Sequence, residues 1–86
     1  MRNEDVIKNY FNFNQAKSSN NNLWTRYTYN NEWELVNYST PLVRYVDGVY
    51  YINTNKYSRT TSKIQTYINR YIERHFTNQR VETMDV

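Results

Sequence analysis

The feature that most constrains the fold is an amphipathic stretch near the C-terminal end of the sequence, "SKIQTYINRYIERHF". Its apolar residues recur at i, i+3, i+4 and i+7, which is the spacing of one face of a helix. They are Ile64, Tyr67, Ile68, Tyr71, Ile72 and Phe76. This spacing predicts a C-terminal helix over residues 60–76 whose apolar face must be covered by another element.

The polar residues around this helix predict where it begins and ends. Ser62 and Gln65 fit a capping box, in which the two side chains satisfy amides that the first turn leaves free. Thr60 and Thr61 then hold the approach to the helix extended. The apolar periodicity is lost beyond the helix, so residues 77–86 are expected to form a frayed tail.

A hairpin is predicted at "VRYVDGVYYIN", because Asp-Gly is a preferred type I′ turn and β-forming residues flank it. A two-residue loop at Asp47-Gly48 pairs Val46 with Val49, Tyr45 with Tyr50 and Val43 with Ile52. Strand alternation places Val43, Tyr45, Tyr50 and Ile52 on one face and Leu42, Arg44, Val46, Val49, Tyr51 and Asn53 on the other. The first set is the more apolar and is expected to meet the core.

A second hairpin and a short helix are predicted upstream. The stretches "LWTRYTYN" and "EWELVNY" are rich in aromatic and β-branched residues, with turn-forming asparagines between them. Residues 14–22 have no apolar periodicity and are expected to form a connecting loop, while "NEDVIKNYF" has helical spacing within residues 1–13.

These elements predict one domain over residues 1–86 with an α+β fold. A small antiparallel sheet of about four strands, made from the two hairpins within residues 23–54, packs on the C-terminal amphipathic helix. The N-terminal helix is expected at an edge of this body or projecting from it. The second face of the sheet is expected to be open, because only one long amphipathic helix is available to cover a face.

The residues that enzymes and metal sites require are scarce in this sequence. There is no cysteine, and the single histidine, His75, has no histidine partner for a zinc site. Its place near the end of a helix suits a surface or capping role. The only glycine is used by the Asp-Gly turn, which leaves none for a phosphate-binding loop. The expected protein is not an enzyme and holds no cofactor or metal.

A basic stripe on the C-terminal helix is one candidate contact surface in a chain of net charge +3. Lys63, Arg70 and Arg74 share a helical face away from the isoleucines, and Arg59 lies just upstream. Glu73, three residues after Arg70, supports the interpretation of a solvated face. The alternative is a patch that meets phosphates or an acidic protein surface.

The open sheet face is the other candidate, with Arg44, Tyr51 and one of Tyr27 or Tyr29. Aromatic rings beside a cation on an exposed sheet can stack single-stranded bases. They can equally anchor a protein interface, where tyrosine and arginine are enriched. Simple burial of the rings is the third interpretation, since the chain has 10 tyrosines.

The stretch "NYSTPLVRYVDGVYYINTNKYSRTTSKIQTYI" resembles a domain of unknown function found in small proteins of tailed bacteriophages. The resemblance is carried by Tyr38-Ser39-Thr40 before a strand and by a Tyr-Ser-x-Thr-Thr-Ser-Lys entry to a helix at residues 57–63. Val43 stands where that domain usually has alanine, and Ile64 stands where histidine commonly follows the basic residue. The resemblance implies a phage origin. Small phage proteins poor in cysteine are often host-takeover factors, and by this analogy a role in host–virus interaction is expected.

Three functions agree with this combination of features. The first is a phage accessory protein that binds and inhibits a host defence complex, with an anti-CRISPR inhibitor as its most concrete form. Its partner is then a host protein or ribonucleoprotein, contacted through Arg44, Tyr51, Arg59, Lys63, Arg70 and Arg74. The second is a small nucleic-acid-binding protein that uses the same residues, and the third is a phage structural or assembly component. No apolar run approaches the roughly 18 residues of a membrane span, so a cytoplasmic location in the infected bacterium is expected.

Overall fold

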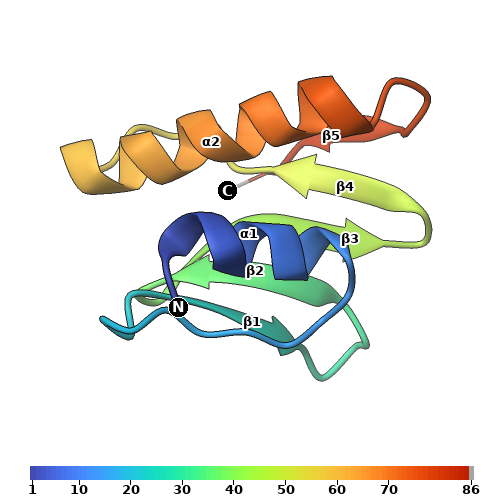
Figure 1. Ribbon diagram of the computed structural model, residues 1–86. Helices are drawn as coiled ribbons and strands as arrows, with labels where there is room; N and C mark the ends of the chain where they lie inside the picture. Colours follow the sequence, from blue (N-terminus) through green and yellow to red (C-terminus); the bar gives the residue numbers. More distant parts are fainter. Residues whose placement is uncertain (86) are drawn as a thin grey trace.

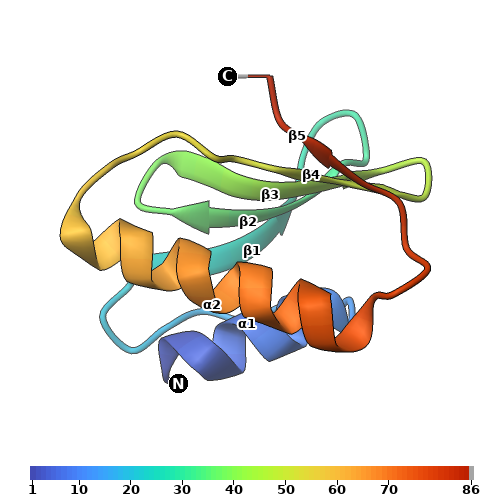
Figure 2. The same cartoon turned by 90° about the horizontal axis from the view of Figure 1, so that it is seen from above.

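The computed structural model describes residues 1–85 and has two layers, a five-stranded sheet and a pair of helices (Figure 1). In chain order the elements are α1 (Asn3–Phe11), β1 (Leu23–Tyr27), β2 (Trp33–Asn37), β3 (Thr40–Val46), β4 (Val49–Ile52), α2 (Arg59–His75) and β5 (Val81–Thr83). The strands lie side by side in sequence order, and only the β4–β5 pair is parallel. Both helices cover the same face of the sheet (Figure 2). The predicted α+β fold is confirmed.

The β3–β4 hairpin has the register that the Asp-Gly turn predicts. Val46 faces Val49 and Val43 faces Ile52, so every predicted pair is formed. Asp47 and Gly48 have φ values of 49° and 82°, and the type I′ turn requires positive φ at both of these positions. The core-facing side of this hairpin is also confirmed, because Val43, Tyr50 and Ile52 are buried in the hydrophobic core.

Leu42 departs from the predicted alternation because of a β-bulge. Leu35 faces Val43 while Val36 faces Pro41, so Leu42 is an extra residue on β3. The bulge lets Leu42 join the core beside Val43, fully buried. Its predicted place on the opposite face is therefore wrong. The residues of β3 after the bulge lie on the faces that the alternation predicts.

Helix α1 lies over the sheet and contributes to the core, so its expected place at an edge or outside the body is wrong (Figures 1 and 2). Its buried residues are Val6, Ile7, Tyr10 and Phe11. Tyr10 and Trp33 of β2 form a reciprocal pair with stacked rings. The Tyr10 hydroxyl donates to the Trp33 carbonyl oxygen at 2.8 Å, and the Trp33 indole nitrogen donates to the Tyr10 carbonyl oxygen at 2.8 Å. These bonds satisfy polar groups that would otherwise be buried without partners.

Helix α2 packs against the core with the predicted residues, but it begins one turn before the predicted cap. The N-cap is Ser58, whose hydroxyl oxygen accepts from the Thr61 amide at 3.3 Å. Ser62 is therefore inside the helix, and the predicted capping box is not formed. The Gln65 side chain instead donates to the carbonyl oxygens of Asn53 and Asn55, both at 3.0 Å, and holds the segment that leads from β4 to the helix.

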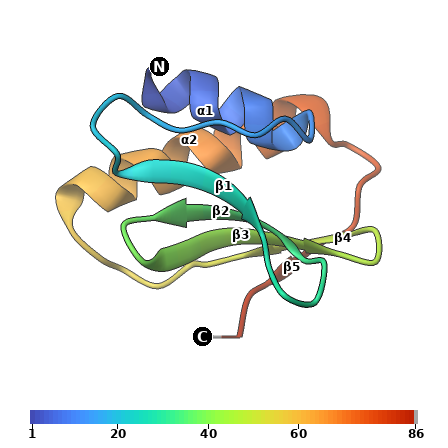
Figure 3. The same cartoon turned by 90° about the horizontal axis from the view of Figure 1, so that it is seen from below.

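The segment after α2 contains a fifth strand, so the expected frayed tail is wrong for β5. β5 pairs in parallel with β4, and the Met84 amide donates to the Ile52 carbonyl oxygen at 2.7 Å. The Met84 side chain is buried, although β5 itself is exposed. After β5 the chain runs to the side of the sheet opposite the helices (Figure 3). Val86, the last residue of the predicted tail, lies outside the described residues.

Candidate functional site

The six predicted contact residues lie in two groups on opposite sides of the sheet. Arg44 and Tyr51 face each other across β3 and β4, on the side that no helix covers. We call this side the outer sheet face. The other four, Arg59, Lys63, Arg70 and Arg74, belong to α2 on the opposite side. The structure therefore does not bring the six residues together into one contact surface.

On the outer sheet face, the charge of Arg44 is compensated by carboxylates of the protein itself. Glu34 lies on β2, between Arg26 on β1 and Arg44 on β3, and it faces both of them. Only 1% of its side chain is exposed. Its two carboxylate oxygens accept from Arg26 Nε at 2.9 Å and from Arg44 Nε at 2.6 Å. Glu32 lies 3.4 Å from Arg44 as well. An external phosphate would have to compete with these carboxylates for the guanidinium group.

The tyrosines expected beside Arg44 are separated from it, except for Tyr51. Tyr51 continues the row of facing residues that crosses the sheet from Arg26 to Glu82. Tyr27 faces Trp33 and so lies on the side that packs against the helices, although it is 57% exposed. Tyr29 is fully exposed in the loop between β1 and β2. The outer sheet face thus has one of the predicted aromatic residues next to its cation.

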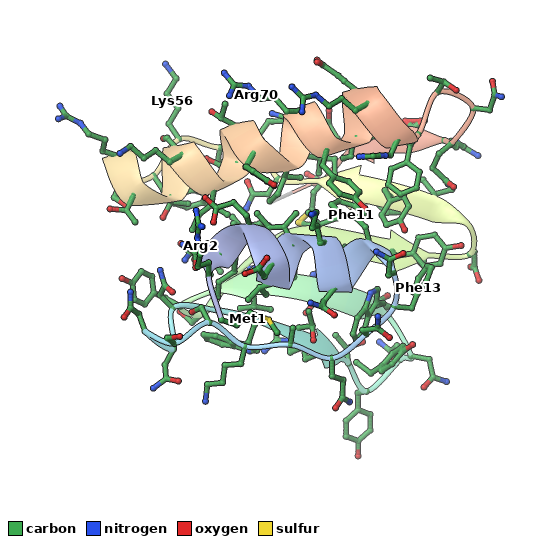
Figure 4. All side chains as sticks on the ribbon, viewed as in Figure 1. Met1, Arg2, Phe11, Phe13, Lys56 and Arg70 are labelled. Carbon is green, nitrogen blue, oxygen red and sulfur yellow. The ribbon has the colours of Figure 1, made fainter. Side chains whose placement is uncertain are left out.

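The basic stripe of α2, which consists of Arg59, Lys63, Arg70 and Arg74, is exposed along its whole length. Figure 4 shows the side chain of Arg70 extending from α2 into solvent. The ion pairs of residues 1–85 involve none of these four side chains, and the Arg70–Glu73 pair suggested by the sequence is not formed. In contrast to Arg44, these cations are available to an external anion.

Two adjoining hollows lie along the basic stripe. The first has a volume of about 320 Å³ and is lined by Arg59, Ser62, Lys63, Thr66, Tyr67 and Arg70. The second has a volume of about 280 Å³ and is lined by Lys8, Tyr67, Arg70, Tyr71, Arg74 and His75. Neither lining contains a carboxylate. Tyr67 and Arg70 line both hollows, which therefore meet at the middle of the helix.

The walls of the second hollow are held by the aromatic core. The Tyr71 ring stacks on Phe11 of α1, with ring centres 4.8 Å apart and planes at 9°. The Tyr71 ring also lies beside the imidazole of His75, with ring centres 4.3 Å apart. Tyr67 also packs against the core. The cations at this end of α2 therefore lie beside rings that packing keeps in place.

A third groove, which sequence reasoning missed, lies at the free edge of β1. It has a volume of about 860 Å³ and is lined by Gln15, Ala16, Lys17, Asn21, Trp24, Thr25, Arg26 and Tyr27. The groove exists because the connecting loop folds back along β1, where the Thr25 amide donates to the Ala16 carbonyl oxygen at 3.1 Å. A loop sequence without periodicity gives no sign of this return.

Three residues of the segment that enters α2, Tyr57, Ser58 and Thr61, have structural roles. Ser58 caps the helix, and the Thr61 hydroxyl donates to the Asn37 side chain of β2 at 2.7 Å. The Tyr57 hydroxyl accepts from the Asn53 side chain at 2.9 Å. These contacts join the start of α2 to the sheet, while Arg59 and Lys63 of the same segment belong to the exposed basic stripe.

Two further properties of residues 1–85 bear on the kind of site expected here. In this part of the chain no helix combines the length and apolar character needed to cross a membrane. The same residues contain no group of three or more His, Cys, Asp and Glu side chains arranged to hold a metal ion.

Comparison of the chain with models of protein families, with curated proteins and with solved structures finds no match.

Proposed function

We propose that the protein is a non-enzymatic phage accessory protein that inhibits a host defence complex by binding it, and that the basic stripe of α2 is its contact surface. The observation that carries the proposal is the availability of the stripe, since its four cations have no ion-pair partner within residues 1–85. A defence ribonucleoprotein, such as a CRISPR effector, offers the phosphate-rich surface that such a stripe fits. The phage resemblance of residues 37–68 supports the biological setting.

The distribution of charge over the molecule supports the same surface. The two arginines of the outer sheet face, Arg26 and Arg44, are compensated by Glu32 and Glu34. Steering of an anionic partner therefore favours approach to the α2 side. Arg44 and Tyr51 are left out of the proposed contact for this reason.

The test is capture of partners from a low-GC bacterial lysate on the immobilised protein, with and without nuclease treatment. A captured defence complex whose cleavage activity the protein reduces in a purified assay supports the proposal, and comparison of the two samples shows whether nucleic acid carries the contact. The Arg70→Ala/Arg74→Ala double variant should lose both binding and inhibition, because it removes two of the four cations of the stripe. Both positions are exposed on the helix, so the fold should stay intact.

The matched control is Arg80→Ala, which removes an exposed arginine that pairs with Glu82 outside the α2 side. This variant should bind and inhibit as the unmodified protein does. Equal activity of all variants, or a bound complex that keeps its full cleavage activity, would contradict the proposal.

A further inference from the structure

The two hollows along α2 meet at Arg70, but together they extend further than one small anion. Their cation pairs, Arg59 with Lys63 and Arg70 with Arg74, are centred about 11 residues apart, which is about 16 Å along a helix that rises 1.5 Å per residue. Inorganic phosphate or pyrophosphate cannot contact both cation pairs at once. Several successive phosphates of one nucleic-acid strand can cover this length.

The lining of the hollows suits phosphate and sugar groups. Guanidinium and ammonium groups come from α2 and from Lys8 of α1, and hydroxyl groups come from Ser62 and Tyr67. The Thr66 hydroxyl also lines the first hollow, but it donates to the Ser62 carbonyl oxygen at 2.9 Å. Arginine donates pairs of hydrogen bonds to phosphate oxygens, and hydroxyl groups donate to phosphate or sugar oxygens. Because the lining has no carboxylate, nothing in it repels a phosphodiester chain.

The same surface lacks the features of a protein interface. Strong protein interfaces are centred on large aromatic or apolar anchors that become fully buried. The exposed large hydrophobic residues of the described chain are Met1, Phe13, Tyr27, Tyr29, Tyr38, Tyr57 and Val81, and none of them belongs to α2. Tyr67 and Tyr71 are partly buried and pack against the core. In the described chain, the α2 surface therefore offers charged groups without a large, fully exposed apolar anchor.

We infer that the partner of the basic stripe is a nucleic-acid strand whose sugar–phosphate backbone runs along α2 across both hollows, with Arg70 at the point where they meet. This inference rests on the proposed function for the choice of surface and adds the chemical class of the partner. Binding is then electrostatic and independent of base sequence.

The test is fluorescence anisotropy with labelled single-stranded DNA, single-stranded RNA and duplex DNA of graded length. Affinity should rise steeply until the strand is long enough to span both hollows and more slowly beyond that length. Lys63→Ala and Arg74→Ala remove one cation from each hollow. Each should weaken binding of long strands and lower the slope of log affinity against log salt by about 1.

Two comparisons control for binding that does not depend on both hollows. Inorganic pyrophosphate should compete poorly with a long strand, because it occupies one hollow only. Arg80→Ala, the control outside the stripe, should leave both affinity and salt slope unchanged. Binding without length dependence, or loss from the control equal to that from Lys63→Ala, would overturn the inference.

The inference and the proposed function fail in different ways. A protein that captures and inhibits a defence complex through Arg70 and Arg74, yet binds no free strand of any length, keeps the proposed function and loses the inference. A protein that binds long strands but inhibits no defence complex keeps the inference about the surface and loses the proposed biological role.

Discussion

At the scale of single residues, Glu34 is the group whose environment is most demanding. Its carboxylate is 1% exposed on the outer sheet face, and it accepts from arginines on both neighbouring strands. A buried carboxylate is costly unless charged donors satisfy it, and removal of the charge leaves those donors with an incomplete set of partners. The ion pairs of Glu34 with Arg26 and Arg44 therefore hold the side chains of β1, β2 and β3 in register.

We expect Glu34→Gln to lower the free energy of unfolding by about 1–3 kcal/mol, because two charge-assisted hydrogen bonds become weaker or are lost. Urea unfolding followed by circular dichroism measures the change. Glu82→Gln, at the exposed Arg80–Glu82 pair, is the matched control and should change stability by less than about 1 kcal/mol. Equal losses in the two variants would show that burial of Glu34 contributes nothing special.

Two buried tyrosines give the protein a predicted dependence on alkaline pH. Burial, and in addition the nearby Tyr45 and Tyr71 hydroxyl groups, raise the pKa of Tyr50 to about 12. Burial also raises the pKa of Tyr10 above its ordinary value. From about pH 10 upward the unfolded chain releases these phenolic protons while the folded chain retains them. The free energy of unfolding should therefore fall as pH rises through this range.

The variant Tyr50→Phe should show a smaller fall in stability between about pH 10 and pH 12 than the unmodified chain, because it has one phenol fewer to ionise on unfolding. Urea unfolding at a series of alkaline pH values measures the slope. Tyr29→Phe removes a fully exposed phenol and should keep the original slope. Parallel curves for all three proteins would contradict the assignment of this pH dependence to Tyr50.

At the scale of elements, the start of α2 depends on Ser58 and not on the predicted Ser62. Both serines are followed by residues that suit a first helical turn, but the Ser58 hydroxyl is the one that accepts from the amide three residues later. Ser58→Ala should therefore lower the free energy of unfolding by about 1 kcal/mol, while Ser62→Ala should have an effect below about 0.5 kcal/mol. Thermal unfolding of the two variants side by side measures the two losses of stability. A larger loss from Ser62→Ala than from Ser58→Ala would instead support Ser62 as the cap.

The elements that could be predicted from the sequence are those specified by their own residues. The Asp47-Gly48 turn determines the register of β3 and β4 locally, and the period of the apolar residues determines the core face of α2. The bulge at Leu42 and the strand β5 depend on neighbours that are distant in sequence. Tertiary pairing, which a local pattern does not contain, decides both of them.

The same reason explains how much of the candidate site was predictable. Helical spacing groups Lys63, Arg70 and Arg74 correctly, because residues on one helix keep their relative positions. The spacing of residues along one helix does not predict that Glu34 of β2 pairs with Arg44. It also does not predict that Lys8 of α1 lies beside the end of α2. Contacts between separate elements therefore had to come from the structure.

At the scale of the whole molecule, the sheet ends in two edges that are protected differently. The connecting loop covers part of β1 through bonds from Ala16 and Ser18. On the other side, β5 covers β4, which is the apolar sequence Val-Tyr-Tyr-Ile. β5 is short and exposed, and it carries Glu82. Short, charged edge strands discourage pairing with another chain, whereas an apolar edge invites it.

A chain truncated after Arg80 should therefore expose the edge of β4 and self-associate as well as lose stability. We expect its mass, measured by light scattering after size-exclusion chromatography, to increase with protein concentration, while the full chain shows no such increase over the same range. Met84→Ala is the matched control, because it removes the buried side chain that follows β5 and leaves the strand in place. That variant should be less stable, with the mass of the full chain.

If the full chain itself assembles with rising concentration, a role as a structural or assembly component becomes the better proposal. If the truncated chain stays at the mass of one chain, β5 does not protect the edge of β4.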